Sequence, residues 1–385
     1  MKTAVLGFGT VGAGIHEMLK TAEGLEPGPV WVRRGKADEA WKTDDFDRIL
    51  ADDSVAAVAE AIGGTDPAFA LAKRVLESGR HFVTANKALV ADCGIELQEA
   101  ADRSGAAFLF SAACGGGVPL LHNLALARRS DEILSVEGIL NGTTNYMLNR
   151  MQHSGLDYGK ALKEAQILGY AEADPFADVS GLDALRKIRL AAAVAFGILP
   201  DGGLNEGIED VTAEDVRFYR SKGLVLRLIA GTEKTADGAS ALVQPVLFPE
   251  SAPEAAVSAN GNLASYEGRR CGRISFSGQG AGRFPTASAV IRDLLSIKDG
   301  ARRMFPEGTA RGKAADGRPS RYLVRLPEAF AGYFPGAEEA AGDEDGSLRL
   351  ITESVSPGEM FRRAERIRKA GGGLAFAALA EDRIC

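Results

Sequence analysis

The chain has 385 residues, of which 45% are hydrophobic, and a formal net charge of −7. This acidic balance excludes a general attraction to nucleic acid or anionic lipid. The longest apolar run, residues 190–199, is well short of the about 20 residues needed to span a membrane. The four cysteines and four histidines are scattered without metal-ligand spacing. We expect a cytoplasmic globular protein with neither a nucleic-acid nor a membrane partner.

Residues 1–125 alternate short strand patterns with helical patterns. Such alternation predicts an α/β fold with a parallel, doubly wound sheet of the Rossmann type. The predicted strands are residues 3–8, 29–34, 55–62, 81–85 and 106–112, and the predicted helices are residues 11–22 and 66–79.

Residues 126–284 mix helical and strand patterns and predict an α+β domain. A helix from Pro285 follows a glycine turn and is expected to complete the first domain at about 285–310. Residues 306–320 are polar and glycine-rich, which predicts a linker. The tail, 320–385, reads as strand, strand, helix and strand, and we expect it to be a small separate domain.

The first predicted turn contains Gly7, Gly9 and Gly12, with Thr10 and Val11 between them. Glycines between a strand and a helix allow a tight turn, and the helix N-terminus presents free N–H groups to a pyrophosphate. This pattern predicts a dinucleotide site. A glycine-rich turn without a ligand is the alternative.

The second strand ends in basic residues, where an acid would bind the ribose of NAD. Arg33, Arg34 and Lys36 occupy this region and favour NADP, with NAD as the alternative. Asp38 and Glu39 follow closely and weaken the preference.

Two more strand ends carry residues suited to cofactor binding. Gly63 and Gly64 follow one strand, and the next ends in the sequence TANKA, which contains Lys87. The carboxyl ends of parallel strands share one edge of the sheet, so these residues are expected to border the cofactor. An ordinary exposed loop lysine is the alternative for Lys87.

An acid-rich loop precedes an apolar helix in the middle of the chain. Asp183 and Lys187 are four residues apart, on the helical stripe that continues through Leu190 and Val194. A surface ion pair is the simple interpretation. The further acids Glu172, Asp174 and Asp178 lie just upstream and instead favour a site for a cationic ligand.

Several motifs together resemble one family, homoserine dehydrogenase, over residues 1 to about 300. They are GFGTVG, VTANKALVA, GGGVPLL, GILNGTTNYML, EAQILGYAEADPFADVSGLDALRKI and GQGAGRFPTASAVIRDL. The glycine loop is common to many dehydrogenases, whereas the fourth and fifth motifs together are specific. The resemblance implies NAD(P)-dependent interconversion of L-homoserine and L-aspartate 4-semialdehyde, in threonine, methionine and isoleucine biosynthesis.

The resemblance also implies roles for individual residues. Glu172 and Asp183 would bind the substrate through its ammonium group, and Lys187 would donate or accept the proton. Lys87 would lie beside the nicotinamide and the reacting oxygen. The remaining implied contacts are Thr143, Tyr170 and Asp178 for the substrate and Thr10, Val11, Gly64, Thr65, Thr84, Gly169, Gly280 and Gly282 for the cofactor.

Oxidation of an alcohol requires removal of the hydroxyl proton as the hydride leaves, and the reverse reaction requires an acid. Lysine serves both directions, although its usual pKa of about 10.4 is high for a base. A second cation lowers a lysine pKa, whereas Asp183 opposes that change. We therefore expect Lys87 and Lys187 to approach one another across the cofactor cleft.

The chain departs from the family pattern in two places. A loop that holds a monovalent cation in some members has Ser111 at the glutamate position, which leaves the backbone carbonyls of Cys114, Gly116 and Val118 as ligands for Na⁺ or K⁺. Cys114 is expected to be a small packing residue. The tail resembles a degenerate ACT module, in which residues 327–347 replace its first helix and second strand. Threonine regulation and a packing role are both left open.

Two other functions fit part of the pattern. One is an NADP-dependent dehydrogenase of another small amino-acid-like hydroxy compound, and the other is a silent NADP-binding regulatory protein. The presence of Lys87, Glu172, Asp183 and Lys187 together argues against the silent protein, which has no chemical need for both lysines. We also expect a homodimer formed through the sheet of the second domain; light scattering that found only a monomer would exclude it.

Overall fold

The computed structural model describes residues 1–342 and 346–380. The chain divides into two compact units that do not follow chain order. The first contains Met1–Leu134, Arg189–Leu199 and Ala264–Arg311, and the second contains Ser135–Ile188, Pro200–Leu263 and the chain from Gly312 onward. The three-domain division expected from the sequence remains a prediction. Among the described residues, no helix has both the length and the apolar character to cross a bilayer.

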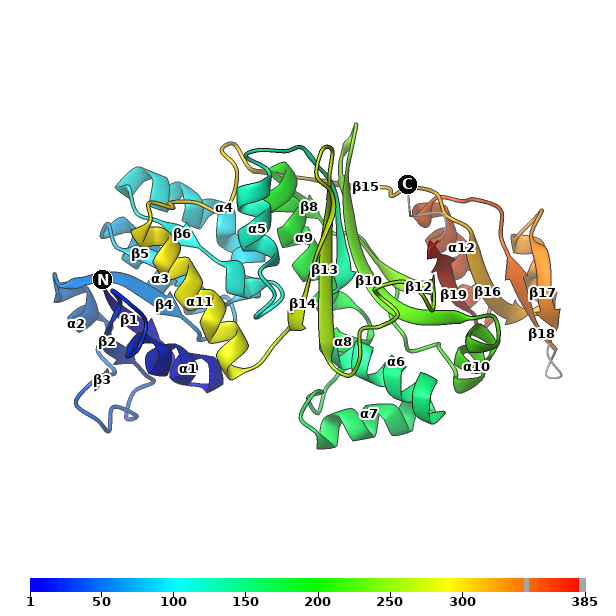
Figure 1. Cartoon of the computed structure of the whole chain (residues 1–385), viewed down its shortest axis with the longest axis horizontal. Coiled ribbons are helices and arrows are strands. Elements are labelled where there is room, and N and C mark those ends of the chain that lie inside the picture. The colour runs from blue at the N-terminus through cyan, green and yellow to red at the C-terminus, as the bar shows by residue number, and fades with distance from the viewer. Residues whose placement is uncertain (343–345, 381–385) are drawn as a thin grey trace. The chain divides into compact units, whose positions relative to one another are not determined.

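The first unit is built on a six-stranded sheet in the order β3-β2-β1-β4-β5-β6 (Figure 1). Its neighbouring strands are all parallel, so the doubly wound Rossmann fold is confirmed. The strands are β1 (Lys2–Leu6), β2 (Glu26–Trp31), β3 (Lys42–Thr43), β4 (Val55–Glu60), β5 (His81–Thr84) and β6 (Phe108–Leu109). The strand order reverses between β1 and β4, where ligands bind in such sheets.

The helices of the first unit follow the predicted alternation, with α2, α4, η1 and α5 in addition. They are α1 (Thr10–Leu19), α2 (Phe46–Ala51), α3 (Ala68–Glu77), α4 (Lys87–Ser104), the 3₁₀ turn η1 (Ser111–Ala113), α5 (Leu120–Ala127) and α11 (Arg283–Lys298). Gly14 lets α1 and α11 pack closely, because a Cβ there would lie 3.2 Å from that of Ala287. The hairpin of β13 (Gly261–Gly268) and β14 (Gly272–Gln279) leads into α11.

The second unit contains a sheet in which seven strands follow the order β7-β10-β12-β19-β16-β18-β17. Their bounds are β7 (Ile133–Ile139), β10 (Leu224–Thr235), β12 (Leu242–Pro249), β19 (Ala375–Leu379), β16 (Tyr322–Pro327), β18 (Ser347–Ile351) and β17 (Glu338–Gly342). The helices are α6 (Gly142–Ser154), α7 (Tyr158–Ile167), α8 (Phe176–Val179), α10 (Ala213–Ser221) and α12 (Pro357–Lys369). Helix α9 (Leu182–Phe196) begins in this unit and belongs to the first unit from Arg189 onward. Short elements are β8 (Ile198–Asp201), β9 (Leu204–Asn205), β11 (Gly238–Ser240), β15 (Ala310–Ala315) and η2 (Glu328–Tyr333).

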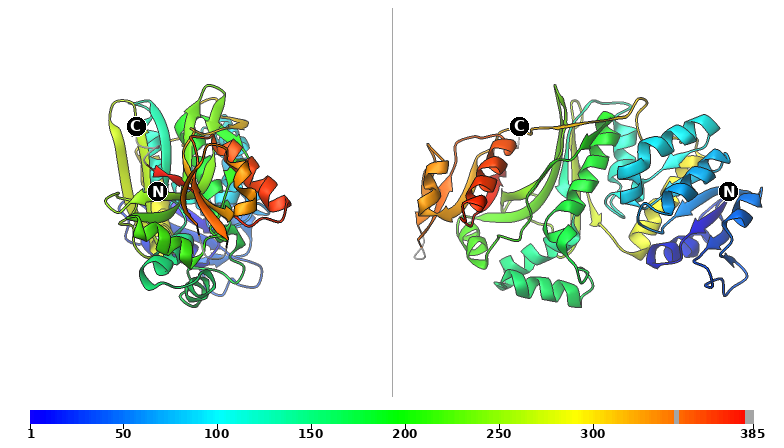
Figure 2. Two further views of the ribbon diagram at one scale, coloured as in Figure 1. Left: turned by 90° about the vertical axis from the view of Figure 1, so that its right-hand side faces the viewer. Right: turned by 180° about the vertical axis from the view of Figure 1, so that it is seen from behind.

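The tail is joined to the rest of the second unit by this sheet. Its last strand, β19, pairs in parallel with β12, with Val246 opposite Ala378 (Figures 1 and 2). Both sides of the junction share one hydrophobic core, which includes Ile229, Tyr322 and Phe376. The tail and the rest of the second unit therefore share one sheet and one core.

Two expectations for this region were wrong. Residues 310–315 form β15, which pairs in parallel with β11, so the predicted linker contains a strand. The tail also keeps its second strand, β17, while its first helix is reduced to η2. The order β19-β16-β18-β17 suits a βαββαβ module, and assignment to the ACT type remains a prediction.

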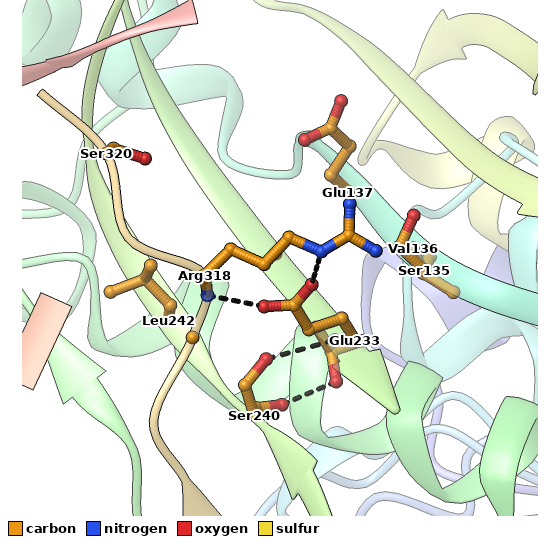
Figure 3. Close-up of a pocket in the computed structure, with 11 residues that line it drawn as sticks. Ser135, Val136, Glu137, Glu233, Ser240, Leu242, Arg318 and Ser320 are labelled. Carbon is orange, nitrogen blue, oxygen red and sulfur yellow. Dashed lines mark hydrogen bonds and ion pairs between the residues drawn. The ribbon is translucent and has the colours of Figure 1, made fainter. Parts of the chain in front are cut away.

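The segment that follows β15 is anchored by an ion pair. Arg318 Nε lies 2.7 Å from Glu233 Oε2, and its backbone N–H donates to Oε1 at 2.6 Å (Figure 3). Ser240 in turn accepts a hydrogen bond from the backbone N–H of Glu233 at 3.0 Å. Because the Glu233 carboxylate is already engaged, the small cavity of about 70 Å³ beside it is better explained as a structural junction than as a ligand site.

Candidate active site

The glycine loop has the backbone geometry of an anion site. Gly7 has a φ of 94°, and a Cβ on it would lie 2.9 Å from the carbonyl oxygen of Ala61. A Cβ on Gly12 would lie 2.0 Å from the carbonyl oxygen of Gly7, so no larger residue fits either position. Gly9 caps α1 without a side-chain hydrogen bond, which leaves the first N–H groups of the helix for a ligand.

A pocket of about 570 Å³ lies beside this loop, at the point where the strand order reverses. Arg33 and Lys36 line it, whereas Arg34 is exposed and lies outside the lining. Asp38 and Glu39 pair with Lys42 at 2.6 and 3.0 Å. The acids that weakened the case for NADP are thus engaged by Lys42. Lys42 and Asp38 themselves line the pocket, so Arg33 and Lys36 add positive charge beside a pair that is already neutralised.

A hydrogen-bond network joins the carboxyl ends of β4 and β5. The buried Glu60 accepts from the Thr84 hydroxyl at 2.5 Å and from the Gly63 N–H at 3.2 Å. Asn86 accepts from the Leu89 N–H at the start of α4, and its side chain donates to the Gly64 carbonyl at 2.5 Å. The network fixes both strand-end loops and the start of α4.

The other expected cofactor contacts are distributed over both units. Lys87 is the first residue of α4, directly after the Asn86 cap, and Thr65 donates to Asp92 at 3.0 Å. Gly280 and Gly282 precede α11, and Gly169 follows α7 in the second unit. The sequence patterns did not predict roles for Glu60, the last residue of β4, or for Asn86, which follows β5 and caps α4.

Asp183 and Lys187 form a buried ion pair in the second unit. Lys187 Nζ lies 2.6 Å from Asp183 Oδ2 and donates to the Leu140 carbonyl at 2.7 Å. The two side chains are 12% and 6% exposed, which excludes the surface ion pair that simple helix spacing allowed. A buried pair of this kind is costly to desolvate and is poorly explained by stability alone.

Asn141 ties a second carboxylate to this pair. Its Nδ2 donates to Asp183 Oδ2 at 3.0 Å and to Asp178 Oδ1 at 2.7 Å, while its Oδ1 accepts from the Thr144 N–H and caps α6. The residue belongs to the quoted NGTT motif, but its role was not predicted. The cluster has two carboxylates and one ammonium group, a balance that suits a cationic ligand.

Three other expected substrate residues lie around this cluster at different depths. The Thr143 hydroxyl is 2.6 Å from the Tyr170 carbonyl and 3.3 Å from Asp178 Oδ2. The Tyr170 ring is 38% exposed and packs against Tyr146, with 5.0 Å between centroids. Glu172 is exposed and does not enter the buried cluster.

Ser111 contacts a buried acid, Asp293, on α11. Its backbone N–H and hydroxyl each donate to the Asp293 carboxyl at 2.7 Å. Burial raises the pKa of Asp293 to about 7, and the Ser111 hydrogen bonds keep it from rising further. Nearby, the Val118 carbonyl already accepts from the Leu120 N–H at 2.9 Å. With Ser111 engaged by Asp293, the loop fits a monovalent cation poorly.

This contact predicts a pH-dependent defect in Ser111→Ala. An aspartate ionises near pH 4 when unfolded, and Asp293 near pH 7 when folded, so stability falls as pH rises between these values. Removing the hydroxyl raises the folded pKa and extends the fall above pH 7. We expect a loss of about 1–3 kcal/mol at pH 8.5 and a smaller one at pH 5.

Urea unfolding of both proteins at the two pH values measures this difference. Ser130→Ala is the matched control, because Ser130 is exposed and its hydroxyl donates only to a carbonyl at the end of a helix. Equal losses at both pH values would contradict the assigned role of the Ser111 hydroxyl.

Two family models match the chain, "Homoserine dehydrogenase, NAD binding domain" over residues 7–111 and "Homoserine dehydrogenase" over residues 119–295. The homoserine dehydrogenase of Synechocystis sp. is 39% identical over 316 residues, which cover 77% of this chain and 73% of that protein. The chain belongs to the homoserine dehydrogenase family. It is an oxidoreductase with a nicotinamide dinucleotide as cofactor.

Further homoserine dehydrogenases match nearly as well. The Corynebacterium glutamicum protein is 38% identical, over 82% of this chain and 73% of that one. The crystal structure of a homoserine dehydrogenase from Thiobacillus denitrificans has a TM-score of 0.84 at 30% identity and covers 98% of both chains. A hyperthermophilic archaeal homoserine dehydrogenase in complex with NADPH shares the fold, with a TM-score of 0.67 at 23% identity.

Proposed function

We propose that this homoserine dehydrogenase interconverts L-homoserine and L-aspartate 4-semialdehyde with NADP as its preferred cofactor. We also propose that Lys187 accepts the hydroxyl proton of homoserine and donates it in the reverse reaction. The buried cluster of Asn141, Asp178, Asp183 and Lys187 carries the assignment of the substrate site. Homoserine presents an ammonium group for the acids and a hydroxyl group for the lysine.

The cofactor pocket fits a dinucleotide with an additional phosphate. The N–H groups at the start of α1 would hold the pyrophosphate, where glycine is the only residue that fits at Gly7 and Gly12. Arg33 and Lys36 would pair with the 2′-phosphate of NADP. A nicotinamide bound there would supply the hydride acceptor for oxidation of homoserine and the hydride donor for the reverse reaction.

The acids of the second unit would bind the amino end of the substrate. Asp183 and Asp178 are held by the same Asn141 amide, so their carboxylates are oriented before the substrate arrives. Thr143 would contact the substrate from the start of α6, next to Asp178. Tyr170 and the exposed Glu172 would lie at the entrance of this substrate site.

Lys187 would exchange the hydroxyl proton. Asp183 and the Leu140 carbonyl fix its Nζ by two contacts, so the amine has a defined position for proton transfer. Lys87, at the start of α4, is proposed as the second lysine of the reaction. Its approach to Lys187 stays a prediction.

A direct assay tests this function. Purified enzyme with homoserine should produce NADPH, detected by its absorbance, faster than it produces NADH from NAD. Turnover of a related hydroxy amino acid but not homoserine would favour the alternative dehydrogenase. Cofactor binding without turnover of either compound would favour a silent binding protein.

The same assay tests the cation. Because the Ser111 hydroxyl donates to Asp293, we expect kcat in sodium, potassium and choline chloride of equal ionic strength to agree within about twofold. Loss of activity in choline that either alkali ion restores would show that the carbonyls of Cys114, Gly116 and Val118 hold a functional cation.

A further inference from the structure

Helix α12 of the tail contacts the loop at residues 205–210, between β9 and α10. Arg368 binds Glu206 at two points, with Nη2 2.5 Å from Oε1 and Nη1 3.1 Å from Oε2. Its Nη2 also lies 2.8 Å from Asp210 Oδ2. The Glu206 side chain is 12% exposed, whereas Arg368 is 37% and Asp210 is 51% exposed, so water screens the Glu206 contact less than the Asp210 contact. Two-point binding fixes the orientation of the carboxylate as well as its distance.

Arg368 extends from a rigid element. Met360, Ala364 and Ile367 of α12 are buried in the core that the tail shares with the rest of the second unit. The Ser356 hydroxyl caps the start of the helix by accepting the Glu359 N–H. The guanidinium is therefore tethered to the sheet through a packed helix.

The same loop is clamped to the turn between α8 and α9. The Asn205 side chain donates to the Ser180 carbonyl at 2.6 Å, and the Ile208 N–H donates to the Val179 carbonyl at 3.0 Å. Gly207 lies so close to this turn that a Cβ on it would come within 2.2 Å of the Val179 carbonyl oxygen. The two backbones are thus in direct contact.

The clamped turn connects the two carboxylates of the candidate substrate site. Asp178 immediately precedes it, and Asp183 follows it in the first turn of α9. The Gly181 N–H donates to the Asp178 carbonyl at 3.0 Å, and the Gly181 carbonyl accepts from the Leu185 N–H at 2.9 Å. A shift of residues 179–181 would therefore move both acids.

We propose that Arg368 is a positioning residue for substrate binding. Through Glu206 and Asp210 it holds the loop 205–210 against residues 179–181, and so keeps Asp178 and Asp183 oriented for the ammonium group of homoserine. This inference rests on the substrate role proposed for those two acids. It gives the tail a place in substrate binding that requires no effector.

Steady-state kinetics of the full-length enzyme test the proposal. Arg368→Gln should raise the KM for homoserine about three- to tenfold, with the KM for NADP and kcat changed by less than about twofold. Arg368→Lys keeps the charge but loses the two-point contact, so an intermediate KM is expected. Glu206→Gln should raise the same KM, and the double variant should be no worse than the more impaired single variant. Arg366→Gln, an exposed change on the same helix, is the control.

Three results would overturn the positioning role. They are an unchanged KM for homoserine in Arg368→Gln, an equal rise in both KM values, and additive effects of the Arg368 and Glu206 changes. If Arg368→Gln does not fold, Arg368→Lys and Glu206→Gln decide by the same criteria. The variant Asp183→Asn distinguishes a failure of the proposed role of Arg368 from a failure of the proposed substrate site. Normal homoserine kinetics in Asp183→Asn would refute the site itself, whereas a defect there with normal Arg368→Gln kinetics refutes only the role of Arg368.

Discussion

Lys187→Ala should lower kcat for homoserine oxidation by about 10²- to 10⁴-fold, the range typical of a lost acid–base group. The reason is positional, because Asp183 and the Leu140 carbonyl hold the Lys187 amine in place and alanine provides no group to take the proton. NADP binding should be nearly unchanged, since the glycine loop and its pocket belong to the other unit. Stopped-flow or steady-state NADPH absorbance measures kcat, and NADPH fluorescence titration measures binding.

Arg186→Ala is the matched control, because Arg186 is the exposed neighbour of Lys187 on α9. The variant should keep wild-type kcat. Removing Lys187 leaves Asp183 buried with one partner fewer, so thermal unfolding must show that Lys187→Ala remains folded at the assay temperature. If Lys187→Ala lost NADPH binding but retained kcat, the assignment of Lys187 as the acid–base group would be wrong.

Replacing both Arg33 and Lys36 by alanine should lower kcat/KM for NADP by about 10- to 100-fold while changing that for NAD by less than about threefold. Both cations line the cofactor pocket, and only NADP carries the 2′-phosphate that they would bind. The ratio of the two kcat/KM values therefore reports on the phosphate contact and is insensitive to a general loss of activity.

Arg48→Ala, an exposed change on α2, controls for the loss of surface positive charge. An equal fall with both cofactors would show that Arg33 and Lys36 shape the pocket without reading the phosphate. Replacing Lys42 by alanine is a separate test, because Lys42 pairs with Asp38 and Glu39. A higher kcat/KM for NAD in that variant would indicate that the released acids bind the ribose.

Local patterns were enough to predict the Rossmann sheet and the stripe that buries Asp183 and Lys187. Strand and helix periodicity depend on neighbouring residues, and the glycines of the first turn stand where the backbone requires them. The position of Gly64 in the loop after β4 followed from the same reasoning, whereas Lys87, expected at the end of a strand, is the first residue of α4.

Contacts between distant residues could not be predicted in this way. Asn141 reaches Asp183 across 42 positions, and Arg368 reaches Glu206 across 162. The segment 310–315 has a weak strand pattern and becomes β15 because β11 and β8 provide its partners. The pairing of Asp38 and Glu39 with Lys42 likewise depended on side-chain placement, which charge patterns alone leave open.

The position of β19 has a consequence for how the molecule is made. This strand comes from residues 375–379, yet it lies inside the sheet, between β12 and β16. During synthesis β9 can pair with β12 only at Leu242 and Val243, so the rest of that edge stays unpaired while about 130 further residues leave the ribosome. The free edge of β12 can therefore pair with an incorrect strand until late in translation. Residues 375–379 end this period when they pair with β12 as β19.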